Sequence, residues 1–199
     1  FNYIEGGFKR YFYFIEGVFQ LKSIYVIRHC EAEGQPPESP LTNKGLKQAI
    51  DLAAFFDNIK VERIISSPYK RAIQTIQPLA KKLNVEIEIN SQLTERVLST
   101  NHLSDWFEKL RTTFEDFEIK FEGGESSQDA VKRILNVVED SFTGEFENTL
   151  IVTHGNLMSL LLNHYNKEFG FDEWLNLSNP DVYLLKIDNN EITSERLWS

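Results

Sequence analysis

The chain has 199 residues, and its 41% hydrophobic and 26% charged residues are typical of one globular domain with a sizeable core. Its 30 acidic and 21 basic residues give a net charge of -9, which argues against nucleic acid or an anionic membrane and favours a small-molecule partner. The single cysteine excludes an intramolecular disulfide and a cysteine-rich metal site and, with no run of about 18 apolar residues, favours a cytoplasmic protein.

Residues 1–20 are crowded with aromatic side chains and lack the charged region and cleavage site of a signal peptide. The codons GAAGGAGTN would encode Glu16-Gly17-Val18 as a ribosome-binding tract, and TTG would encode Leu21 as an alternative start. We therefore expect residues 1–20 to be an extension that is not native, and residues 21–199 to form the domain. The alternative is an extra strand or membrane-surface arm at residues 10–19. N-terminal mass spectrometry of the protein made from its own gene decides between them.

Residues 22–28 form the first predicted strand, because they are dense in Ile, Tyr and Val. The strand ends in Arg28 and His29, followed by a loop rich in proline. Thr42 is a good N-cap, and apolar residues at helical spacing predict a helix from there to about Phe56.

The second predicted strand covers residues 61–66 and leads to Ser67 and Pro68, which are typical of the N-cap and first position of a helix. That helix is expected over residues 69–83 and has Arg71 in its first turn. A cation there works against the helix dipole, so Arg71 is better explained by an anion that it faces than by its own helix.

A third strand is expected at residues 85–89, followed by a short segment that contains Glu95. Residues 102–117 have an apolar stripe at helical spacing, and this helix could belong to the core or to a lid. Gly123-Gly124-Glu125-Ser126 predicts a turn and an N-cap, which open a helix that ends near Phe142.

The fourth predicted strand, residues 148–153, repeats the pattern of the first because it ends in His154. A helix at residues 157–165 follows, and residues 182–187 and 191–197 predict a hairpin at the edge of the sheet. Strands that alternate with helices indicate an α/β fold with a mostly parallel sheet between two helical layers, α/β/α.

Five polar residues lie at the ends of predicted strands or in the turn after one: Arg28, His29, Arg71, Glu95 and His154. Ligands of open α/β sheets bind at the carboxyl ends of the strands. Two guanidiniums beside two imidazoles suit a dianion, because planar donor forks match phosphate oxygens. The cations make metal ligation by His29, His154 and Glu95 the less favoured alternative.

Five motifs, in this order, make residues 22–165 similar to one known family. They are Arg28-His29-Cys30-Glu31 with Gln35, Leu41-Thr42 and Gly45-Leu46-Lys47-Gln48-Ala49; Ser66-Ser67-Pro68-Tyr69-Lys70-Arg71-Ala72-Ile73-Gln74-Thr75; Leu93-Thr94-Glu95; Gly123-Gly124-Glu125-Ser126; and Val152-Thr153-His154-Gly155. The chain resembles the histidine phosphatase superfamily, also called phosphoglycerate mutase-like. Each motif is weak alone, but the five together are a specific signal.

The resemblance implies a phosphomonoesterase that forms a phosphohistidine intermediate, acts on a small phosphorylated metabolite and needs no metal or organic cofactor. It also implies a role for each matched residue. His29 would be the nucleophile; Arg28, Arg71 and His154 would hold the phosphoryl oxygens; Gln35 would lie where the family usually has asparagine; and Glu95 would donate a proton to the leaving alcohol and later activate water.

Two features of the sequence leave alternatives open. The residue after the nucleophile is Cys30, where the family normally has glycine, so the site could be reshaped into a non-catalytic phosphate-binding site. The thiol could have a lowered pKa beside the cations, or it could be a small buried apolar group.

The segment after Glu95 is short, which favours a phosphatase over a mutase. Its expected lid residues are Arg96, His102, Trp106 and Arg111. The oligomeric state and the physiological substrate stay open.

Overall fold

A computed structural model describes residues 22–188 and 191–198. Its centre is a six-stranded sheet with the strand order β3-β2-β4-β1-β5-β6. The strands are β1 (Ser23–Arg28), β2 (Arg63–Ser66), β3 (Ile87–Ile89), β4 (Asn148–Thr153), β5 (Asp181–Asp188) and β6 (Glu191–Arg196). β1 to β4 pair in parallel, whereas β5 is antiparallel to β1 and β6 to β5. The prediction of a mostly parallel sheet is confirmed.

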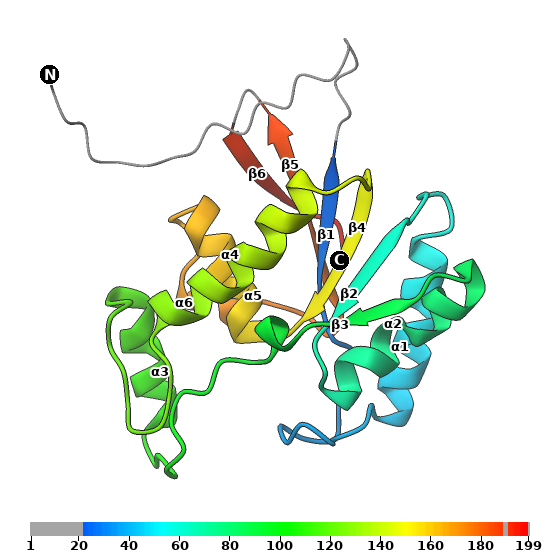
Figure 1. The fold of residues 1–199 in the computed structure, drawn as a ribbon. Helices are drawn as coiled ribbons and strands as arrows, with labels where there is room; N and C mark the ends of the chain where they lie inside the picture. The colour runs from blue at the N-terminus through cyan, green and yellow to red at the C-terminus, as the bar shows by residue number, and fades with distance from the viewer. Residues whose placement is uncertain (1–21, 189–190, 199) are drawn as a thin grey trace, which may run out of the picture.

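The helices form a layer on each face of this sheet (Figure 1). They are α1 (Asn43–Phe55), α2 (Lys70–Leu83), α3 (Trp106–Glu115), α4 (Ser127–Thr143), α5 (Gly155–Tyr165) and α6 (Phe171–Leu175), with a 3-10 helix at Ser91–Leu93. α1 and α2 cover one face, and α4 and α5 cover the other, as the three-layer prediction requires. No helix in the described part of the chain is long and apolar enough to cross a membrane.

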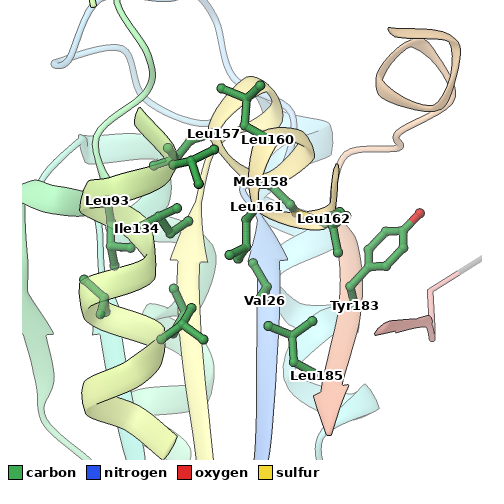
Figure 2. Packing of buried hydrophobic residues seen from close by; sticks show 14 of the residues in the cluster. Val26, Leu93, Ile134, Leu157, Met158, Leu160, Leu161, Leu162, Tyr183 and Leu185 are labelled. Carbon is green, nitrogen blue, oxygen red and sulfur yellow. The ribbon is translucent and has the colours of Figure 1, made fainter. Parts of the chain in front are cut away.

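The strands supply both layers of the core because their side chains alternate between the two faces. Ile24 and Val26 of β1 pack with α4 and α5, whereas Tyr25 and Ile27 pack with α1 and α2. Figure 2 shows the first of these layers, in which Leu161 of α5 lies over Val26 and Leu162 of the same helix lies beside Tyr183 of β5. A buried strand of this kind is rigid, so the residues at its carboxyl end are held in fixed positions.

Two of the three predicted N-caps are confirmed. Thr42 Oγ1 accepts a hydrogen bond from the Gly45 N–H, and Ser126 Oγ accepts one from the Asp129 N–H. The prediction for Ser67 is wrong, because α2 begins at Lys70, two residues after the position that we expected for a helix start at Pro68. The Ser67 hydroxyl lies 2.7 Å from Nε2 of His154 and accepts a hydrogen bond of 3.3 Å from the N–H of Tyr69, the residue before α2.

The terminal hairpin lies at the sheet edge as predicted, with β5 against β1 and β6 outermost. Helix α6 was not predicted, since five residues are too few to show a helical period. The possible start at Leu21 and the alternative strand or arm at residues 10–19 lie outside the described residues.

Candidate active site

The two histidines follow neighbouring strands and lie side by side. β1 pairs with β4 so that Arg28 is opposite Thr153, and the next residues are His29 and His154. The centroids of the two imidazole rings are 5.2 Å apart. Two segments separated by more than a hundred residues in the sequence thus form one site, as the strand-end prediction required.

The imidazole of His29 is held as a neutral ring with one defined tautomer. Its Nδ1 lies 2.7 Å from the carbonyl oxygen of Cys30, and a carbonyl can only accept, so Nδ1 carries the proton. Nε2 therefore has a lone pair, which accepts a hydrogen bond of 3.1 Å from Nε of Arg71. Burial, with a smaller contribution from the charges of Arg71 and Arg28, lowers the pKa of His29 to about 3 against the opposing hydrogen bond to Cys30. Nε2 is thus unprotonated at neutral pH, as a nucleophilic imidazole requires, and its lone pair is held by the Arg71 donor.

Arg71 is buried, with only 1% of its surface exposed, and points into the site. Its Nη1 donates to the carbonyl oxygens of Gln35 and Pro36, both at 2.9 Å, and its guanidinium lies 4.8 Å from the centre of the Tyr69 ring. Burial lowers its pKa against the attraction of Glu95. The guanidinium thus binds His29 and the loop at residues 35–36, and its expected contact with an anion stays a prediction.

Arg28 and His154 each carry a buried nitrogen without a hydrogen-bond partner among the described residues: Nε of Arg28 and Nδ1 of His154. Nη1 of Arg28 donates to the carbonyl oxygens of Leu177 and Ser178, and Nε2 of His154 bonds to Ser67. A buried polar atom without a partner costs free energy, so a binding role of Arg28 and His154 toward a ligand stays a prediction that these two atoms favour.

Gly155 allows Arg28 to approach the start of α5 closely. A Cβ at position 155 would lie 3.0 Å from Nε of Arg28 and 3.2 Å from its central carbon, Cζ. The guanidinium therefore packs directly against the backbone beside His154. This close packing explains why the fifth motif has a glycine at position 155.

The carboxylate of Glu95 lies at the N-terminus of α5, where it binds backbone N–H groups two and three residues after His154. Its Oε2 accepts from the Asn156 N–H at 3.1 Å, and its Oε1 accepts from the Leu157 N–H at 3.0 Å. The first free N–H groups of a helix favour an acidic partner, so Glu95 caps α5 from outside the helix. This second role was missed, because no local pattern links residues 95 and 157.

A family model for the histidine phosphatase superfamily (branch 1) matches residues 24–198. The chain belongs to this superfamily. Phosphoserine phosphatase 1 of Hydrogenobacter thermophilus is 26% identical over 144 residues, which are 65% of this chain and 68% of that protein. The probable phosphoglycerate mutase GpmB of Shigella dysenteriae is 28% identical over 158 residues, 70% of this chain and 72% of that protein.

The fold is also that of solved histidine phosphatases. The mycobacterial glucosyl-3-phosphoglycerate phosphatase, solved with inorganic phosphate, superposes with a TM-score of 0.71 at 20% identity. The match covers 89% of this chain and 96% of that one. A Bacillus stearothermophilus protein, YhfR, gives 0.69 at 23% identity over 88% of this chain and 96% of its own.

Cys30 fits its position in this histidine phosphatase without strain. Its side chain is completely buried beside Leu41 and Ala49, and its backbone N–H donates to Oγ1 of Thr75 at 2.9 Å. Among the described residues other than glycine only Asn84 has a positive φ, so the turn does not require glycine. Burial raises the pKa of the thiol to about 12. The alternative of a lowered thiol pKa is therefore wrong, and Cys30 is a small buried apolar group.

Gln35 lies in the loop that Arg71 binds, but the contact uses its backbone carbonyl and the side chain is exposed. A role of that side chain in phosphate binding stays a prediction. The described residues contain no cluster of three or more His, Cys, Asp or Glu side chains that could hold a metal ion.

The expected lid residues differ in their surroundings. Arg96 is buried, donates to Oγ1 of Thr113 at 2.8 Å and to the Glu125 carbonyl at 3.2 Å, and so joins α3 to the turn before α4. Arg111 lies 4.6 Å from the centre of the Phe171 ring, against α6. His102 and Trp106 are exposed. Arg96 therefore packs within this segment, and a substrate contact by the other three stays a prediction.

Proposed function

We propose that this histidine phosphatase is a phosphomonoesterase that works without a metal ion and moves the phosphoryl group of a small metabolite through Nε2 of His29. The observation that carries the proposal is the hydrogen bonding of that imidazole. The Nδ1–H donates to the Cys30 carbonyl, while Nε2 keeps its lone pair next to the buried guanidinium of Arg71. The phosphatases among the relatives support the reaction class.

In the first step, the Nε2 lone pair attacks phosphorus and the bond from phosphorus to the alcohol oxygen breaks. Arg28, Arg71 and His154 bind the phosphoryl oxygens, and Glu95 in its acid form gives its proton to the leaving oxygen. In the second step, water attacks phosphorus, the ionised Glu95 takes a proton from it, and Nε2 leaves. The sum is ester plus water giving alcohol plus phosphate.

The hydrogen bond between Arg71 and His29 must break before this attack. In the free enzyme Nε–H of Arg71 occupies the Nε2 lone pair. A bound phosphoryl oxygen is a stronger, charged acceptor and draws that donor to itself. Substrate binding thereby frees the nucleophile at the moment when it is needed.

A mutase is the second candidate, since a probable phosphoglycerate mutase is among the relatives. It differs in that the phosphoryl group returns to the substrate and not to water. The decisive assay is phosphoryl transfer between positions of phosphoglycerate compared with release of free phosphate. The non-catalytic alternative rested on Cys30, and the absence of a positive φ at that residue argues against a reshaped turn.

The direct test is hydrolysis of p-nitrophenyl phosphate in the presence of a chelator. We expect turnover by the native protein, and a loss in kcat of roughly 10^4-fold or more in His29→Ala, as for other nucleophiles. His164→Ala is the matched control, because His164 lies near the end of α5 and contacts Tyr165. No native turnover, or undiminished turnover in His29→Ala, would contradict the mechanism.

Glu95 is tested by the choice of leaving group. Glu95→Gln should slow alkyl phosphates more than p-nitrophenyl phosphate, because an alkoxide needs the proton and an acidic phenol does not. The substitution also disturbs the cap of α5 and thereby lowers stability. The ratio of the two rates is therefore the measurement, and an equal loss on both substrates would remove Glu95 from proton transfer.

A further inference from the structure

The backbone on both sides of Cys30 is held by side chains from three other elements. The first peptide group joins His29 to Cys30. Its carbonyl accepts from Nδ2 of Asn179 at 2.7 Å, and its N–H donates to Oγ1 of Thr75 at 2.9 Å. Both ends of this planar group are therefore fixed.

The second peptide group joins Cys30 to Glu31 and contains the carbonyl that accepts from Nδ1 of His29. Its other end, the Glu31 N–H, donates to Oε1 of Gln48 at 2.9 Å. A peptide group is planar, so its N–H and its carbonyl turn together. Gln48 thus sets the direction of the oxygen that determines where His29 carries its proton.

Gln48 also joins this peptide group to the segment before β5, because its Nε2 donates to the Asn179 carbonyl. α1 is pressed against the same loop. The Thr42 N–H donates to the Glu31 carbonyl at 3.0 Å, and a Cβ on Gly45 would lie 2.0 Å from that oxygen. The glutamine is therefore presented from a helix that cannot shift away from the loop.

We propose that Gln48 is a positioning residue that fixes the tautomer of His29 through the peptide group between Cys30 and Glu31. The inference rests on His29 being the nucleophile of the proposed reaction. Without Gln48 the peptide group can rotate and turn its carbonyl away from Nδ1. The proton can then move to Nε2, with the Arg71 donor turned away from that atom, and Nε2 has no lone pair for the attack.

The test compares Gln48→Leu with Gln74→Leu. Gln74 lies on α2, is half-buried like Gln48 and accepts from the Leu41 N–H at 2.9 Å, so it makes the same kind of bond to the same loop. The tautomer of His29 is read from 15N NMR at pH 7 of protein labelled in its 4 histidines, with the His29 signals assigned by their loss in His29→Ala.

In Gln48→Leu we expect a mixture of tautomers at His29 and a kcat on p-nitrophenyl phosphate that is roughly ten- to a hundredfold lower, with little change in KM. KM should hold because the arginines that bind the phosphoryl group are untouched. Gln74→Leu should keep the native tautomer and kcat. Gln48→Met replaces the leucine variant if that one does not fold.

The proposal is overturned if the variant of Gln48 keeps the native tautomer, or if Gln74→Leu loses as much activity. The tautomer is measured without substrate. A native protein that hydrolyses no phosphate ester would therefore contradict the proposed function, while the NMR comparison would still decide the role of Gln48.

Discussion

The ends of β1 and β4 carry the same residue type in the same place, but with different hydrogen bonds. His29 donates from Nδ1 to a carbonyl, whereas His154 bonds through Nε2 to the hydroxyl of Ser67. A carbonyl only accepts and permits one tautomer, but a hydroxyl donates or accepts and permits both. The difference fits the two proposed roles, because a nucleophile needs its lone pair in one place and a partner of the phosphoryl oxygens needs a proton that it can give.

The largest expected difference is between the two alanine variants of these histidines. His29→Ala should reduce kcat to background, whereas His154→Ala should cost roughly 10^2- to 10^4-fold and leave measurable turnover. Steady-state kinetics on p-nitrophenyl phosphate measure both. Equal losses would mean that the two imidazoles act as one unit and not in separate roles.

Removal of the cation beside His29 should have the next largest effect. Arg71→Ala should lower kcat by about 10^2- to 10^3-fold, because one charged donor to the transition state is lost. Arg111→Ala is the control, an exposed arginine on α3 that rests on Phe171. A comparable loss in the control would extend the site into the expected lid segment.

The neutral state of His29 should also appear in the stability of the fold. Burial lowers its folded pKa to about 3 from an ordinary 6.5, so between these pH values the unfolded chain binds the proton that the folded chain refuses. The contribution of His29 to the free energy of unfolding should therefore be constant above pH 6.5. It should decrease as the pH drops from 6.5 toward 3.

Denaturant unfolding across this pH range measures the effect. The free energy of unfolding should fall less steeply with pH in His29→Ala. The difference in slope should correspond to at most about one proton taken up on unfolding. An identical slope in the variant would show that His29 is charged in the folded protein below its ordinary pKa.

The smallest effect is expected at the hydroxyl beside His154. Ser67→Ala leaves a buried imidazole nitrogen without its partner and should lower the free energy of unfolding by about 1 kcal/mol. Its kcat should fall much less than that of His154→Ala, since the imidazole of His154 and its unpaired Nδ1 are kept. A loss as large as in His154→Ala would mean that the hydroxyl itself takes part in the reaction.

The sequence predicted the parts of the site that depend on strand ends. An apolar strand that ends in histidine is visible locally, and parallel strands place such ends together, so His29 and His154 were predicted to meet. Arg71 was found because its charge opposes its own helix. These signals need only the order of elements and the charge of single residues.

The parts that were missed depend on contacts with backbone atoms from distant segments. Gln48 and Asn179 act on the peptide groups of residues 29–31, and Glu95 caps a helix that begins 60 residues later. A glutamine that binds a backbone N–H looks like any other polar helix residue in the sequence. The N-cap prediction for Ser67 was wrong for a related reason, because a serine that can cap a helix can equally bind a histidine from a distant segment.

The most direct test of the account is to stop a reaction with p-nitrophenyl phosphate within its first turnovers and to locate the phosphoryl group by mass spectrometry at neutral or basic pH. We predict phosphohistidine at His29, in the isomer with phosphorus on Nε2, and none in His29→Ala. A phosphoryl group on His154, on Nδ1 of His29 or on no residue at all, with hydrolysis still proceeding, would contradict the assignment of His29 as the nucleophile.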